Sequence, residues 1–141
     1  MHTKRWAILL VPAAFFLAAG AEVAGLDPCS AQPDRAISEM LKEFQAPVRE
    51  LDVRETPDLL PILAATAATT PGETRFSGAA RLRLKESDRL RAMAEGIRAI
   101  GGAALEEPDG LIVRCGGAPA GGSVDACGDH RIAMAFAIAG T

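Results

Sequence analysis

The sequence predicts an α/β (α+β) fold built from short strand–helix units, and two observations carry that prediction. Helix-like and strand-like segments of similar length alternate along most of the chain, as in folds that lay helices on a sheet. Apolar residues at helical spacing mark the helices, most clearly at Leu90, Met93, Ile97 and Ile100. The glycine pairs between residues 116 and 122 lack G-x-G-x-x-G spacing, so a dinucleotide-binding domain is not expected.

The first half of the chain is expected to form a helix, a strand and a second helix. Residues 30–46 carry apolar side chains at helical spacing, with Asp34 as the expected N-cap, and the proline that follows ends this helix at residue 45 or 46. Residues 51–53 alternate between apolar and charged, which is typical of a short strand. Thr56 is the expected cap of the next helix, which a Pro-Gly pair ends near residue 69.

The second half is expected to repeat this alternation. Residues 74–84 predict one or two strands, because apolar and basic residues alternate there. Ser87 or Asp88 is the expected cap of the following helix, and Gly101 suits the left-handed position just past its end. The remaining expected elements are strands near residue 104 and over residues 111–113, and a helix from Asp129 through Ile138.

The N-terminal segment has two interpretations from the residues alone. Lys4 and Arg5 precede an apolar run over residues 6–21, which is interrupted by Pro12 and ends in small residues. This outline is typical of a secretory signal, although the run is short for a membrane span. A buried, alanine-rich helix that starts after Pro12 explains the same pattern. The two interpretations are about evenly matched.

Composition excludes several classes of partner. The chain has 141 residues, enough for one ordinary domain, and a net charge of -3. It has neither a basic tail nor interleaved aromatic and basic residues, so nucleic acid is not expected as a partner. The three cysteines lie far apart and their odd number argues against a disulfide framework, so we interpret them as reduced thiols of a cytoplasmic protein.

Two charged runs contain the residue types expected of a binding site. Residues 85–90 (KESDRL) and 128–135 (GDHRIAMA) each put cations and carboxylates into the first turn of a predicted helix. A helix N-terminus presents free N–H groups and a partial positive charge, so Lys85, Arg89 and Arg131 favour a phosphate or carboxylate ligand there. The neighbouring carboxylates can cap the helices or move protons. Each run taken singly is also an ordinary solvated helix start, but together they predict acid–base chemistry on an anionic substrate.

Four segments resemble signatures of one enzyme family and occur in that family's order. They are residues 13–20 (AAFFLAAG), 57–61 (PDLLP), 81–90 (RLRLKESDRL) and 128–135. Together they are similar to the EPSP synthases (3-phosphoshikimate 1-carboxyvinyltransferases). The resemblance implies the enolpyruvyl transferase fold of repeated βαβαββ units, here incomplete, with residues 13–141 as part of the family's second domain and residues 1–12 unmatched. It also favours a helix over a secretory signal at residues 13–20.

The resemblance implies a transferase of the shikimate pathway, which leads to the aromatic amino acids. Such an enzyme moves the enolpyruvyl group of phosphoenolpyruvate to the 5-hydroxyl of shikimate 3-phosphate and releases phosphate. Both substrates are anionic, which agrees with cations at helix N-termini. Carboxyl and ammonium groups can add and remove the protons that the reaction needs, so the family implies neither a metal nor another cofactor. The family also implies a cytoplasmic enzyme.

The resemblance assigns roles to five residues. Asp58 matches an aspartate that contacts the shikimate hydroxyls and accepts a proton. Lys85 matches a lysine that touches shikimate 3-phosphate and shares in proton transfer, and Glu86 matches a glutamate that handles the proton of phosphoenolpyruvate. Arg89 and Arg131 match arginines that bind phosphoenolpyruvate.

Three further charged or titratable residues are given no direct part in the reaction. Asp129 and His130 are expected to hold Arg131 in place. Asp109 lies in a Pro-Asp-Gly turn, and its expected role is structural.

The resemblance covers only part of the family's usual two-domain protein. The family's first domain has no counterpart in the 141 residues, and neither has the segment after the Asp-His-Arg helix, which carries a further lysine for phosphoenolpyruvate. We therefore expect this chain to be inactive alone and to need a first domain as its partner. A membrane is not expected as a partner. The alternative, from another class, is a non-catalytic secreted or membrane-tethered α/β module that uses its N-terminal helix as a signal.

Overall fold

The structure, a computed structural model, describes residues 33–140 together with residues 17, 20–22, 24, 29 and 31; of residue 34 it describes the backbone alone. The helices and strands in chain order are α2 (Ile37–Lys42), β1 (Val48–Asp52), α3 (Leu60–Thr69), β2 (Gly72–Ser77), α4 (Arg89–Ala99), β3 (Ala103–Glu107), β4 (Gly110–Cys115) and α5 (His130–Ala139). Short 3-10 helices cover Pro33–Ala36, Glu43–Gln45, Pro57–Leu59 and Ala80–Leu84.

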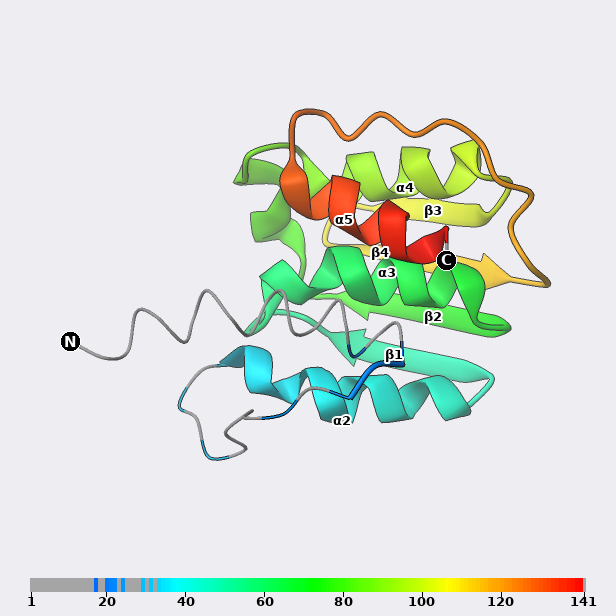
Figure 1. The fold of residues 1–141 in the computed structure, drawn as a ribbon. Helices are drawn as coiled ribbons and strands as arrows, with labels where there is room; N and C mark the ends of the chain where they lie inside the picture. The colour runs from blue at the N-terminus through cyan, green and yellow to red at the C-terminus, as the bar shows by residue number, and fades with distance from the viewer. Residues whose placement is uncertain are drawn as a thin grey trace.

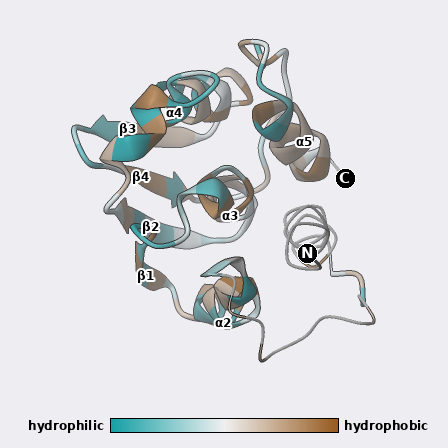
Figure 2. Cartoon of the chain, turned by 90° about the vertical axis from the view of Figure 1, so that its left-hand side faces the viewer, coloured by the Kyte–Doolittle hydropathy of each residue, from teal (hydrophilic) through white to brown (hydrophobic). Residues whose placement is uncertain are grey.

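The strands form one four-stranded sheet in the order β1-β2-β4-β3 (Figure 1). β1 and β2 run parallel, and β4 lies antiparallel between β2 and β3. In chain order, β1, α3, β2, α4, β3 and β4 make one βαβαββ unit, which confirms the fold class predicted from the sequence. Helices α2, α3 and α4 lie on one side of the sheet, and α5 packs on α3 and α4 (Figure 2).

The sheet presents one face to the helices and the other to solvent. On β2, Thr74 and Phe76 are fully buried beneath the helices, whereas Arg75 is exposed. On the outer face, Arg75 pairs with Glu107 across the sheet at 3.2 Å. This alternation is typical of a sheet that is half buried.

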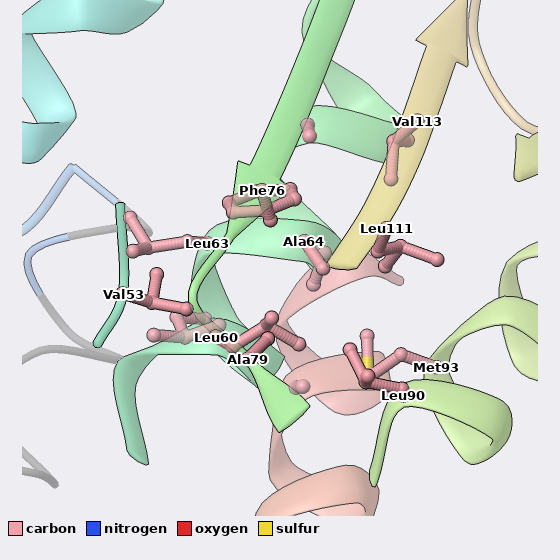
Figure 3. Packing of buried hydrophobic residues seen from close by; sticks show 14 of the residues in the cluster. Val53, Leu60, Leu63, Ala64, Phe76, Ala79, Leu90, Met93, Leu111 and Val113 are labelled. Atoms are coloured by element: carbon pink, nitrogen blue, oxygen red, sulfur yellow. The ribbon is translucent and has the colours of Figure 1, made fainter. Parts of the chain in front are cut away.

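Helix α3 forms the centre of the core. Eight of its residues are buried, including Leu60, Ile62 and Leu63, so the helix is apolar on all sides. In Figure 3, Leu60, Leu63 and Ala64 of α3 lie among side chains of the sheet and of α4, such as Phe76 and Leu90. Each fully buried side chain of this size contributes about 1.5–3 kcal/mol to folding.

One expected helix cap is wrong, and a second lacks the expected side-chain hydrogen bond. The expected helix over residues 30–46 begins as a 3-10 helix that contains Asp34, and α2 then starts after Ala36 without a side-chain cap. Its expected end is confirmed, because the following 3-10 helix stops at residue 45. Thr56 occupies the expected N-cap position, before the 3-10 helix Pro57–Leu59, but its side chain makes no capping hydrogen bond. Its buried hydroxyl donates instead to Sδ of Met40 at 3.9 Å, since α2 packs close by.

The expected strand over residues 74–84 is wrong beyond Ser77. There the backbone N–H groups of Ala79 and Ala80 donate to the main-chain and side-chain oxygens of Asp109, at 3.0 and 2.7 Å. These bonds turn the chain into the 3-10 helix Ala80–Leu84, so Lys85 follows a 3-10 helix rather than a strand. The structural role expected of Asp109 is consistent with these contacts.

The caps expected later in the chain are confirmed. The Asp88 side chain accepts from the backbone N–H of Arg91 at the start of α4. Gly101, just past the end of α4, has a φ of +89°. Asp129 caps α5 in the same way as Asp88 caps α4.

The two interpretations of residues 6–21 fall almost wholly outside the described residues. Leu17 is helical and packs against the core. Among the residues that the structure describes, no helix is long and apolar enough to cross a membrane.

Candidate active site

The site residues come together where the parallel strands β1 and β2 end. Asp58 follows β1, Lys85 and Glu86 follow β2 through a 3-10 helix, and Arg89 begins α4. Arg131 is in the first turn of α5, which packs on α3 and α4. Carboxyl ends of parallel strands and helix N-termini are the usual place for ligands in folds of this kind.

Arg89 is the centre of the site. Its side chain is 1% exposed and donates hydrogen bonds to three carboxylates. Nη1 reaches Asp58 at 2.9 Å, Nη2 reaches Glu86 at 2.5 Å, and Nε reaches Asp129 at 2.8 Å. A guanidinium has five N–H donors in a planar fork, which suits it to link three acceptors. Arg89 therefore ties the starts of α3, α4 and α5 together.

Asp129 is the most buried carboxylate of the site. One of its oxygens accepts from the backbone N–H of Arg131 at 3.0 Å, and the other accepts from the Ser87 hydroxyl at 2.9 Å and from Arg89 Nε. Burial by itself raises the pKa of Asp129, but the hydrogen bonds from Arg89, Ser87 and the Arg131 backbone together outweigh it and lower the pKa overall. Asp129 is therefore ionised at neutral pH.

Asp58 is surrounded by cations. Its carboxylate lies 2.9 Å from Arg89 Nη1, 3.5 Å from Arg131 Nη2 and 3.7 Å from Lys85 Nζ. The Asp58 side chain is 31% exposed, so water reaches this group. Arg89 also contacts Glu86 and Asp129, so three carboxylates balance these three cations, and an anionic ligand binds here in competition with Asp58 for the same cations.

Arg131 has a donor available for a ligand. Its Nη1 atom is buried and has no hydrogen-bond partner within the described part of the chain. A buried donor without an acceptor is costly, so a ligand oxygen placed there gains a strong charge-assisted bond. His130, next to it, is exposed.

The structure brings together all five residues predicted for the site, namely Asp58, Lys85, Glu86, Arg89 and Arg131. Two contacts were not predicted. Asp129 holds the side chain of Arg89, whereas it contacts Arg131 through the backbone, and Ser87 binds Asp129 instead of capping α4. Among the described residues, no group of His, Cys, Asp and Glu is arranged to hold a metal ion.

The βαβαββ unit, with its charged cluster at the ends of β1 and β2, defines a class: the α+β folds of the enolpyruvyl transferases. Comparison with known families makes this specific. The chain belongs to the EPSP synthase (3-phosphoshikimate 1-carboxyvinyltransferase) family, whose model matches residues 12–141.

Curated relatives and solved structures agree with the family. The chain is 39% identical to a 3-phosphoshikimate 1-carboxyvinyltransferase of Halobacterium salinarum, over 91% of this chain and 36% of the relative. It is also 39% identical to one from Dehalococcoides mccartyi, over 92% of this chain and 36% of the relative. An EPSP synthase structure from Acinetobacter baumannii superposes with a TM-score of 0.76 at 27% identity, over 93% of this chain and 39% of that one. The chain thus spans about a third of the length of these relatives.

Proposed function

We propose that this chain supplies second-domain residues of an enolpyruvyl transferase that joins phosphoenolpyruvate to the 5-hydroxyl of shikimate 3-phosphate in the cytoplasm. The observation that carries the proposal is the position of Lys85, Arg89 and Arg131 around Asp58. Family membership supports the chemistry, and the convergence of these three cations, with Nη1 of Arg131 lacking a partner among the described residues, supports anionic substrates.

The geometry supports the roles that the resemblance gives to the carboxylates. Asp58, 3.7 Å from Lys85 Nζ, is placed to take the proton of the attacking hydroxyl and share it with the lysine. Glu86 is 56% exposed, so its carboxylate reaches both solvent and Arg89 and can exchange a proton with a substrate. Arg131, whose Nη1 has no partner among the residues that the structure describes, and Arg89 bind the carboxylate and phosphate groups of phosphoenolpyruvate.

Turnover is proposed to need a first domain. The chain spans about a third of the length of its relatives, and the family model matches its residues 12–141. We therefore expect the 141-residue chain alone to bind phosphoenolpyruvate but not to convert shikimate 3-phosphate. Turnover by the purified chain alone would contradict this, and activity that appears on mixing with a family first domain would support it.

Replacing Arg131 with alanine is expected to weaken phosphoenolpyruvate binding about tenfold, because one charge-assisted hydrogen bond to a ligand is lost. Isothermal titration calorimetry of the 141-residue chain measures this directly. Arg98→Ala is the matched control, since Arg98 lies in the last turn of α4 and its Nη1 donates to the Ala104 carbonyl at 3.4 Å.

The control is expected to bind like the wild type. Equal heats for the wild type and Arg131→Ala, or no binding by the wild type at all, would contradict the proposed site. A thermal unfolding scan of each variant separates lost binding from lost folding.

A further inference from the structure

We infer that Ser87 and Asp129 act as a positioning pair that fixes the direction of the Arg89 guanidinium in the site. One of its two tests, the binding of phosphoenolpyruvate, rests on the proposed function. Neither residue is among those assigned to substrate contact. Their effect on the reaction runs through Arg89.

The pair is defined by one shared oxygen. Oδ2 of Asp129 accepts from the Ser87 hydroxyl at 2.9 Å and from Arg89 Nε at 2.8 Å. Oδ1 of the same carboxylate accepts from the backbone N–H of Arg131 and lies 3.4 Å from Arg89 Nη2. Because the Asp129 side chain is 0% exposed, water does not compete for these bonds. One carboxylate thus sets the position of both arginines.

The direction of Arg89 depends on this pair. Its other two partners, Asp58 and Glu86, have side chains that are 31% and 56% exposed. They contact the outer nitrogens Nη1 and Nη2, whereas Asp129 contacts Nε, which is closest to the backbone. With Nε held, the two outer nitrogens stay aimed at the carboxylates of Asp58 and Glu86.

Ser87 contributes orientation rather than charge. Its hydroxyl is partly buried and donates a hydrogen bond to Asp129. It donates to the oxygen that Arg89 also uses, so it stops the carboxylate from rotating. Removing a hydroxyl at this partly exposed position leaves no cavity in the core.

The test compares Ser87→Ala with Ser87→Thr in the 141-residue chain, since threonine keeps the hydroxyl. Calorimetry gives the dissociation constant for phosphoenolpyruvate, and nitrogen-15 NMR gives the solvent exchange rate of the Arg89 Nε–H. Ser87→Ala is expected to raise the dissociation constant about three- to tenfold and to speed the exchange, with little change in melting temperature. Ser87→Thr is expected to restore both values.

The outcomes separate this inference from the proposed function. If the wild type binds no phosphoenolpyruvate, the proposed function fails, and the Nε–H exchange rates still decide the inference. If the Arg89 Nε–H of Ser87→Ala exchanges at the same rate as in the wild type, the inference is overturned. Equal damage in Ser87→Ala and Ser87→Thr also overturns it, because the hydroxyl would then not be what matters. Faster exchange that threonine restores supports it.

Discussion

Replacing Arg89 with methionine is expected to lower the free energy of unfolding by about 3–5 kcal/mol. Methionine fills a similar volume, so packing around the start of α4 is largely kept. The loss arises because Asp129, fully buried, no longer has the guanidinium that compensates its charge, so the carboxylate is either left unpaired or has to take up a proton. Since domains of this size are stabilised by about 5–15 kcal/mol, this is a large share of the total. Urea denaturation measures the change.

The control and the pH dependence identify the cause. Arg91→Met changes a neighbouring arginine of α4 that is 67% exposed and pairs with Glu95, so its effect is expected to stay within about 0.5 kcal/mol. Because folding lowers the pKa of Asp129, its contribution to wild-type stability is complete above about pH 4 and is lost as the pH falls further and the carboxylate protonates. The deficit of Arg89→Met should therefore narrow in acid. A deficit that stays constant down to pH 3 would contradict the ionic explanation.

Periodicity and turn residues predicted most of the fold, because those signals are local. The helix over Arg89–Ala99, its cap at Asp88 and its end at Gly101 follow from residues within a few positions of one another. The strand expected through Leu84 failed because a residue far along the chain decides that segment. The oxygens of Asp109 bind the backbone at Ala79 and Ala80, and no pattern within residues 74–84 reveals this.

The same limit applies to the site. The residues were found because their charges cluster in two short runs and in the segment around Asp58. Their arrangement could not be predicted, since Arg89 bonds to carboxylates 31 and 40 residues away in the sequence. In the sequence, a Lys-Glu-Ser-Asp-Arg run predicts exposed side chains. The burial of Arg89 depends on α5 packing beside α4, which only the tertiary structure brings about.

Replacing Asp58 with asparagine is expected to tighten the binding of inorganic phosphate at least about tenfold, opposite in sign to Arg131→Ala. The Asp58 carboxylate already pairs with three cations, Arg89 at 2.9 Å, Arg131 at 3.5 Å and Lys85 at 3.7 Å. It therefore competes for them with any anion that binds. Asparagine keeps an acceptor for Arg89 and removes the negative charge. A tenfold change in the dissociation constant requires about 1.4 kcal/mol. Removing one negative charge within about 4 Å of the bound anion changes the binding free energy by more than this at low salt, where screening is weak.

Calorimetry with phosphate at low and high salt measures this change, and the gain should shrink as salt is added. Asp52→Asn is the matched control, because Asp52 is an exposed carboxylate whose nearest cation, Arg54, lies 4.0 Å away on the surface. Phosphate binding that is unchanged or weaker in Asp58→Asn would mean that the cations are not shared between Asp58 and the ligand. Tighter phosphate binding would explain why the site contains an aspartate at all: its negative charge weakens the hold on phosphate, the product that must leave, while its oxygens remain available to accept a proton.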